Sequence, residues 1–258
     1  MTTERTIKLT IEYDGTAYAG WQVQPDVSTV QGEIEAAIKR VTGSFTRLIG
    51  AGRTDAGVHA AGQVAHGNIV SDMTPDRLCR ALNGVMPRDI TIVEAAEVPA
   101  DFSARFDATS RTYRYTISRR RLAIGRAYAW ESPYRLEIGK LEAATVPLIG
   151  TCNLRGFSKG EDDDDYDTII FRNSWTENEH LLTFEISGIR FFHHAVRSIV
   201  GTAVDSARGR TELDRIARVL MDRDRNLAGS TAPAKGLCLY SISYGSLNVH
   251  PEDQHDIA

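Results

Sequence analysis

The sequence predicts an α+β fold made of two similar halves with mostly antiparallel strands. Three observations support this prediction. The chain has 258 residues, enough for one large domain or two small ones. Apolar residues in the first hundred positions alternate between strand and helix periods in a β-α-β-β-α-β order. The remainder resembles this order in outline, and we expect the two halves to join near residues 100–105.

In the first half, strand-like alternation and helix-capping residues mark the elements. Ser28-Thr29-Val30-Gln31 is a capping box that opens a helix, and its apolar residues recur at helical spacing. Thr74-Pro75 places an N-cap before a proline at the first helical position, and this second helix stops near Gly84. The expected strands are residues 6–13, 46–50, 63–69 and 90–98.

In the second half, a long strand comes first and a strand closes the chain. The expected strands are residues 108–118, 168–175, 181–187 and 237–244, and the expected helices are residues 141–149, 192–207 and 212–221. The helix over 192–207 places Phe192, Val196 and Ile199 on one apolar face. The acidic residues after Ser246 predict a frayed tail. We therefore expect units at 1–103, 104–246 and 247–258.

Composition excludes several classes of protein. With 42% apolar and 25% charged residues, the chain is neither collagen-like nor disordered. It has no run of 18 apolar residues, and its N-terminus lacks the apolar core of a signal peptide, so we expect no contact with a membrane. The cysteines, Cys79, Cys152 and Cys238, are odd in number and widely spaced. They predict neither a disulfide framework nor a C-x-x-C metal pair, which fits a reducing cytoplasm.

The net charge of −4 hides an uneven distribution. Six acidic residues lie between Glu161 and Asp167, and the rest of the chain carries 30 basic and 28 acidic residues. Residues 103–126 contain seven arginines and only Asp107 as an acid. Such a basic segment can attract phosphates whatever the total charge, although a solvated arginine-rich strand remains an alternative. The acidic run predicts a surface loop rather than a metal site.

A glycine-rich loop, Gly50-Ala51-Gly52-Arg53-Thr54-Asp55-Ala56-Gly57-Val58-His59-Ala60, is the most informative stretch. It fits neither the dinucleotide fingerprint nor the P-loop pattern, because Asp55 and Val58-His59 stand where those motifs need Gly and Lys-Ser. In an extended segment Arg53 and Asp55 point to the same side, which predicts an ion pair. An ionised, positioned aspartate suits a nucleophile, while an Asx-turn aspartate held by a salt bridge is the alternative.

The loop and further blocks resemble the tRNA pseudouridine synthase A family. Residues 52–60, GRTDAGVHA, are similar to that family's signature. Other similar blocks, in chain order, are Tyr13-Asp14-Gly15-Thr16, Gly20-Trp21-Gln22, Thr29-Val30-Gln31-Gly32, Ala81-Leu82-Asn83, Pro87-Arg88-Asp89-Ile90, Phe102-Ser103-Ala104-Arg105-Phe106, Arg111-Thr112-Tyr113-Arg114-Tyr115 and Phe192-His193-His194-Ala195-Val196-Arg197. The resemblance runs from about Lys8 to Tyr244, nearly the whole chain.

This resemblance implies a fold and an activity. The fold is two ferredoxin-like halves whose strands form one extended sheet with a central RNA-binding cleft. The activity is isomerisation of uridine to pseudouridine at positions 38, 39 and 40 of the tRNA anticodon stem and loop, by a homodimer without cofactor. Asp55 would be the catalytic aspartate, acting on the sugar carbon or assisting glycal formation. Arg53 would hold Asp55 and help keep the target nucleotide out of the stack.

The resemblance also assigns other residues. Tyr113 would stack on the uracil and is a candidate for the late proton transfer at carbon 5, and Leu237 falls where the family has an apolar residue against the site. Arg111, Tyr113 and Tyr115 share a strand face as a possible stacking and phosphate-binding stripe. His193, His194 and Arg197 share the polar side of a predicted helix and fit RNA contacts better than a metal, because no carboxylate or cysteine lies at ligand spacing nearby. His59 and His66 are expected to be structural.

Some residues depart from the family pattern. Asn153 and Leu154 replace an Asp-Phe pair, and Cys238 replaces a tyrosine. These departures leave Asp55, Arg53 and Tyr113 intact and bear on RNA contacts of the second half. Two rival functions stay open: an RNA-binding or chaperone protein without chemistry, and a hydrolase that uses Asp55 with His59.

Overall fold

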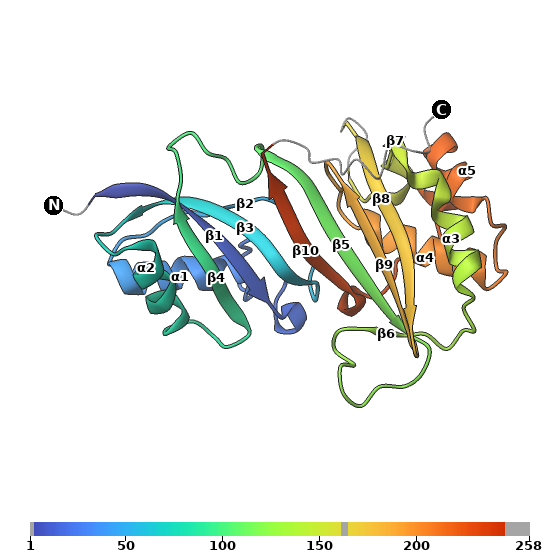
Figure 1. Ribbon diagram of the computed structural model, residues 1–258, viewed down its shortest axis with the longest axis horizontal. Helices are drawn as coiled ribbons and strands as arrows, with labels where there is room; N and C mark the ends of the chain where they lie inside the picture. The colour runs from blue at the N-terminus through green and yellow to red at the C-terminus, as the bar shows by residue number, and fades with distance from the viewer. Residues whose placement is uncertain (1–2, 161–164, 246–258) are drawn as a thin grey trace.

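A computed structural model describes residues 3–160 and 165–245, and the strands of this part form one open sheet (Figure 1). The strands are β1 Glu4–Tyr13, β2 Ile49–Gly50, β3 His59–Val70, β4 Ile90–Glu97, β5 Ala108–Ser118, β6 Trp130–Glu131, β7 Gly150–Asn153, β8 Asp167–Asn178, β9 Leu181–Gly188 and β10 Leu237–Tyr244. The helices are α1 Val30–Thr42, α2 Pro75–Asn83, α3 Ile138–Thr145, α4 Ala195–Ala207 and α5 Arg215–Asp222. Short 3₁₀ turns are η1 Gly15–Ala17, η2 Val146–Leu148, η3 Arg155–Phe157, η4 Arg225–Leu227 and η5 Ala234–Gly236.

The sheet order is β4-β1-β3-β10-β5-β9-β8-β7, with β2 beside β3 and β6 beside β5. All pairs are antiparallel except β3–β10 and β5–β6. The predicted α+β class and mostly antiparallel sheet are therefore confirmed. Helices α1 and α2 lie beside the strands of the first half, and α3, α4 and α5 lie beside those of the second (Figure 1).

The first half has the predicted β-α-β-β-α-β order. Helix α1 is capped by Thr29, whose hydroxyl accepts from the Gly32 backbone N–H at 3.3 Å, one residue later than the capping box implies. Helix α2 has the predicted Thr74 cap with Pro75 at its first position. Strand β3 begins at His59 rather than at residue 63, because pairing with β1 and β10 extends it beyond its alternating segment.

The second half departs from the prediction at several boundaries. Strands β6 and β7 have only two and four residues, too few for an alternation signal. Helix α3 ends at Thr145 and gives way to η2, because Pro147 cannot donate the hydrogen bond that continues an α-helix. Helix α4 begins at Ala195, so the expected start at residue 192 is wrong. The acidic residues 161–164 and the predicted tail lie outside the described residues.

Strand β10 joins the two halves. It runs parallel to β3, with Cys238 opposite His59, and antiparallel to β5. The junction is tight at Gly62, where a Cβ atom would lie 2.7 Å from the Tyr240 carbonyl oxygen. One hydrophobic core continues across it, from Leu9 and Ile34 in the first half to Phe184 and Ile199 in the second. Within residues 3–160 and 165–245, helices that are both long and apolar enough to cross a membrane do not occur.

Candidate active site

Asp55 lies on the loop between β2 and β3, and backbone hydrogen bonds to the first half fix this loop. The Trp21 N–H donates to the Thr54 carbonyl at 3.1 Å, and the hydroxyls of Tyr13 and Thr54 lie 2.7 Å apart. Gly57 adopts φ +75°, a left-handed conformation that glycine accepts without strain. The glycines of the loop therefore serve a tight turn that holds Asp55 at the edge of the first half.

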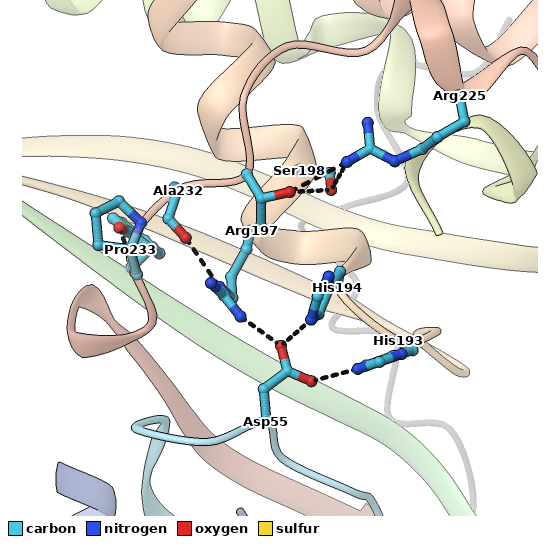
Figure 2. Close-up of polar contacts among 10 residues, drawn as sticks. Asp55, His193, His194, Arg197, Ser198, Arg225, Ala232 and Pro233 are labelled. Carbon is cyan, nitrogen blue, oxygen red and sulfur yellow. Dashed lines mark hydrogen bonds and ion pairs between the residues drawn. The ribbon is translucent and has the colours of Figure 1, made fainter. Parts of the chain in front are cut away.

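The side chain of Asp55 is 15% exposed and turns towards the second half, where three cationic or imidazole groups surround it (Figure 2). Arg197 Nη1 donates to Oδ2 at 2.8 Å. His194 Nε2 lies 3.5 Å from the same oxygen, and His193 Nε2 lies 3.4 Å from Oδ1. Among the described ion pairs of Asp55, every partner comes from the segment that opens α4.

Arg197 is oriented by a loop that packs on α4. Its Nε donates to the Ala232 carbonyl at 2.8 Å, and the Ala232 N–H donates to the Arg197 carbonyl at 3.0 Å. This loop approaches the helix at Gly201, where a Cβ atom would lie 1.6 Å from the Ser230 carbonyl oxygen. Gly201 thus permits the contact that aims the Arg197 guanidinium at Asp55.

The sequence predicted that His193 and His194 lie on the polar side of the helix. In the structure both residues precede α4. His194 adopts φ +67°, unusual for a residue with a side chain, and the helix begins at the next residue. Burial lowers the pKa of His194, with the positive charges of its neighbours adding to the effect and Asp55 opposing it. A lowered pKa leaves this imidazole neutral at pH 7, so Arg197 is the partner that balances the charge of Asp55.

The predicted ion pair between Arg53 and Asp55 does not form. Arg53 is exposed, and the described partners of Asp55 are Arg197, His193 and His194. The carboxylate of Asp55 instead turns towards the segment that opens α4, where these three partners lie.

Tyr113 lies on β5, almost fully buried, with its ring against Phe191 at 5.2 Å between centroids. Burial raises the pKa of Tyr113 to about 12, and the negative charge of Asp55 adds to this shift while Arg111 opposes it. The phenol therefore stays protonated at neutral pH. Leu237 opens β10 opposite Tyr115 and is 5% exposed, so it belongs to the core beside this site.

Arg111 shares its strand face with Tyr113 and Tyr115, but all three are buried. The Arg111 guanidinium donates to backbone carbonyls of Ala51, Arg105, Ala108 and Ile189, with distances from 2.6 to 3.4 Å. Tyr115 donates its hydroxyl to the Pro233 carbonyl at 2.7 Å. These contacts tie the Asp55 loop to the second half, and they engage the groups that the predicted phosphate-binding stripe would use.

His59 links the two halves through backbone groups. Its Nδ1 accepts from the Gly15 N–H at 3.1 Å, which leaves a proton on Nε2 to donate to the Ala127 carbonyl at 3.1 Å. The same Nδ1 lies 3.1 Å from Asp14, but an imidazole nitrogen that accepts from Gly15 cannot donate to that carboxylate. Both ring nitrogens are engaged away from Asp55, which argues against the hydrolase reading. His66 is structural too, since its Nδ1 accepts from the Ala104 N–H.

The arginine-rich segment divides into two groups. Arg114 and Arg119 form ion pairs with Glu185 and Glu177. The exposed members are Arg105, Arg120, Arg121 and Arg126. Tyr128 donates its hydroxyl to Asp14 at 2.7 Å and so anchors the end of this basic loop on the first half. Sequence reasoning missed this anchor, although the turn-forming Asp14-Gly15 pair marks the place.

The cluster of Asp55, His193 and His194 can hold a metal ion. One ligand atom from each residue lies within 4.8 Å of the others. The sequence argument against metal ligation considered only carboxylates and cysteines close in sequence, and the fold adds Asp55 to these histidines. The fold brings Asp55 across 138 residues to His193.

Comparisons with known proteins identify the family of the chain. Residues 9–107 and 144–245 match the family described as tRNA pseudouridine synthase. The chain is 41% identical over 246 residues to tRNA pseudouridine synthase A of Caldicellulosiruptor bescii, covering 93% of this chain and 100% of the relative. It is 40% identical to that of Moorella thermoacetica, covering 92% and 99%. The crystal structure of the archaeal box H/ACA sRNP Nop10-Cbf5 complex aligns at TM-score 0.36 and 11% identity, over 77% of this chain and 43% of that one.

Proposed function

The chain belongs to the tRNA pseudouridine synthase family, and we propose that it acts at positions 38, 39 and 40 of the anticodon stem and loop through Asp55 and without a cofactor. The enzyme is an isomerase that converts uridine into pseudouridine. The position in tRNA, the catalytic carboxylate and the absence of a cofactor are the parts that we propose.

One observation carries the assignment of Asp55. Its carboxylate is held at the junction of the two halves by Arg197, which bonds Oδ2 at 2.8 Å. A guanidinium donates a charge-assisted hydrogen bond to a carboxylate and fixes its orientation. The other oxygen, Oδ1, has His193 at 3.4 Å as its partner among the described residues, and His193 is 54% exposed. Oδ1 is therefore the oxygen that a ribose entering from solvent can reach.

The reaction conserves all atoms of the nucleotide. The glycosidic bond between ribose carbon 1′ and uracil nitrogen 1 breaks, the uracil turns, and a bond forms between carbon 1′ and carbon 5. The proton on carbon 5 is lost, and nitrogen 1 gains one. Asp55 can open the glycosidic bond by attacking carbon 1′ or by assisting formation of a glycal. Either route uses an ionised carboxylate beside the ribose.

Tyr113, Leu237 and Arg53 complete the proposed site. Tyr113 carries the aromatic ring that we propose to stack on the extruded uracil, and Leu237 is a buried apolar residue of the same hydrophobic core. Because its pKa is raised to about 12, Tyr113 fits stacking better than removal of the carbon 5 proton as a phenolate. The exposed Arg53 lies two residues from Asp55, where a guanidinium can hold the phosphate of the flipped nucleotide.

For the RNA-binding surface, we propose the exposed arginines 120, 121 and 126 and His193. Among the earlier RNA-binding candidates, His194 and Arg197 face Asp55, and Arg111 supports the backbone. Their contacts favour a role in shaping the site over direct binding of phosphate. We also propose that the enzyme works as a homodimer in the cytoplasm.

A tritium-release assay tests the proposed activity. Purified full-length protein, treated with a chelator and given no nucleotide, is incubated with an anticodon-arm RNA that carries tritium at carbon 5 of uridine. We expect tritium release, because carbon 5 loses its proton in the isomerisation. Replacing the uridines at positions 38, 39 and 40 by cytidine, one at a time, should remove the corresponding part of the signal.

The other outcomes favour the rival functions. RNA binding with no tritium release from any unmodified tRNA would support a binding protein or chaperone. Free uracil in solution would support hydrolysis, because the base would then leave without being reattached. Release that needs an added metal or nucleotide would contradict the cofactor-free mechanism.

A further inference from the structure

His193 and His194 lie next to each other on one side of the Asp55 carboxylate, with 4.1 Å between their ring centroids and their Nε2 atoms directed at different carboxylate oxygens (Figure 2). Two imidazole nitrogens and a carboxylate oxygen form a donor set that Zn²⁺ accepts, and imidazole also suits other late first-row transition metals. Hard ions such as Mg²⁺ and Ca²⁺ prefer oxygen ligands alone. The chemistry of the cluster therefore selects for ions of the Zn²⁺ class.

The spacing of these atoms is close to the spacing that such an ion imposes. Zn²⁺ binds nitrogen and oxygen at about 2.0–2.2 Å, and tetrahedral ligands at that radius lie roughly 3.3–3.6 Å from one another. His193 Nε2 lies 3.4 Å from Oδ1 of Asp55 and His194 Nε2 lies 3.5 Å from Oδ2, and one ligand atom from each of the three residues lies within 4.8 Å of the other two. The ligand atoms must therefore move closer together before all three can bind one ion.

The surroundings leave the cluster open on one side. The Asp55 side chain is 15% exposed and that of His193 is 54% exposed, so an ion can enter from solvent past His193 and keep a water as its fourth ligand. Arg197 opposes a cation through its charge, but it bonds Oδ2 and leaves Oδ1 available. Because the guanidinium repels a cation, an ion can bind here only if the imidazole nitrogens bind it strongly. This again favours Zn²⁺ over hard ions.

We propose that Asp55, His193 and His194 form a Zn²⁺-binding site, and that the bound ion inhibits the enzyme by occupying the carboxylate. The binding site is independent of the reaction, whereas the inhibition rests on the proposed function of Asp55. An ion on Oδ1 takes the lone pair that would act on the ribose. Substrate RNA and Zn²⁺ then compete for the same carboxylate.

Direct binding measurements test the site without turnover. Titration of the metal-free full chain with ZnCl₂, followed by calorimetry, should show one ion per chain, and CoCl₂ should give visible absorption bands typical of nitrogen and oxygen ligation. We expect His193→Asn and His194→Asn each to weaken binding by at least about tenfold, since even the groups that only support metal ligands are worth about 10–100-fold. His180→Asn is the control, because His180 lies beside Glu179 outside the cluster.

The outcomes separate the two parts of the proposal. Circular dichroism establishes that each variant is folded before its binding is compared. Zn²⁺ affinity that is the same in wild type and in both folded histidine variants would overturn the site. Binding at the site with undiminished tritium release would overturn the inhibition. Absence of tritium release from the metal-free enzyme would instead contradict the proposed function, and the Zn²⁺ titration would still decide the site.

Discussion

The two halves of the molecule contribute different parts of the proposed active site. The first half supplies the carboxylate on a loop fixed by backbone hydrogen bonds, such as that from Trp21 to Thr54. The second half supplies the described side-chain partners of that carboxylate, from the segment that opens α4. Neither half holds a complete site. The comparison teaches that the surroundings of Asp55 form where the two halves meet. A residue close to Asp55 in sequence, such as Arg53, is not thereby its partner in the fold.

The largest effect is expected on the side of the first half, from Asp55→Asn. The amide keeps the size and hydrogen-bonding shape of the carboxylate but loses its charge and its nucleophilic oxygen. Turnover should fall by more than about 10⁴-fold, as happens when a reacting group is removed, while tRNA affinity stays largely unchanged. Single-turnover tritium release measures the loss of turnover, and a filter-binding measurement gives the tRNA affinity. Appreciable turnover in the variant would show that Asp55 does not react.

The next effect compares Arg197 in the second half with Arg53 in the first. Arg197→Met removes the donor 2.8 Å from Oδ2 and should lower kcat by about 10²-fold, with little change in tRNA affinity. Arg53→Met removes an exposed guanidinium and should instead weaken tRNA binding by about tenfold, equal to about 1.4 kcal/mol. Separate measurement of kcat, KM and Kd distinguishes them. The same pattern of change in both variants would refute this division of roles.

The third effect concerns the support of α4. In Gly201→Ala the new Cβ would lie 1.6 Å from the Ser230 carbonyl, so the loop that carries Ala232 must move. We expect a loss of about 3 kcal/mol or more in the free energy of unfolding, at the upper end for an overpacked site, together with lower turnover through Arg197. Gly139→Ala on α3 is the matched control, because a Cβ there meets nothing within 4 Å. That variant should gain about 0.5–1 kcal/mol.

Urea denaturation of both glycine variants measures these changes. If Gly201→Ala were as stable as the wild type, the close approach between α4 and the Ser230 loop would not exist in solution. If it were destabilised but retained full kcat under folding conditions, the loop would not be what aims Arg197.

The smallest effect is a pH dependence of stability that arises in both halves. Burial lowers the pKa of His66 in the first half and of His194 in the second. The unfolded chain therefore binds protons that the folded chain does not as the pH falls below about 6.5. The free energy of unfolding should decrease with falling pH in this range, until the folded-state pKa values are reached.

Each of His66→Asn and His194→Asn should reduce the slope of stability against pH just below 6.5. Chemical denaturation at a series of pH values from 5 to 8 gives this slope. His180→Asn serves again as the control. A slope that is unchanged in both variants would mean that these imidazoles titrate alike in the folded and unfolded chains.

Sequence alone predicted much of the fold and pointed to Asp55 as the proposed reacting group, but it did not predict the partners of Asp55. Alternation over β1 and helical spacing over α1 are local signals, and both elements form where expected. Strand β6 has two residues and no such signal. The loop glycines and the family resemblance pointed to Asp55. The Arg197–Asp55 pair joins residues 142 apart, and a pairing at that distance depends on how the halves dock rather than on any local pattern.

Arg111 is a second residue whose contacts could not be predicted from the sequence. Its position among six other arginines between residues 103 and 126 predicted contact with phosphate. In the fold it is 8% exposed and binds four backbone carbonyls from three stretches of the chain. Net charge along a sequence cannot distinguish a guanidinium in solvent from one that satisfies buried backbone groups, because burial is a property of the tertiary structure.

The position of β10 has a consequence for the timing of protein synthesis. This strand pairs with both β3 and β5, yet it begins at Leu237, 140 residues after the end of β4 at Glu97. A ribosome that adds about 5–20 residues per second needs roughly 7–30 s to cover that stretch. During this interval the Asp55 loop is already made, while the strand that unites the sheet is missing, and Arg197 is added only 100 residues after Glu97. A nascent or truncated chain therefore lacks the assembled site, and catalytic competence arrives only as translation nears its end.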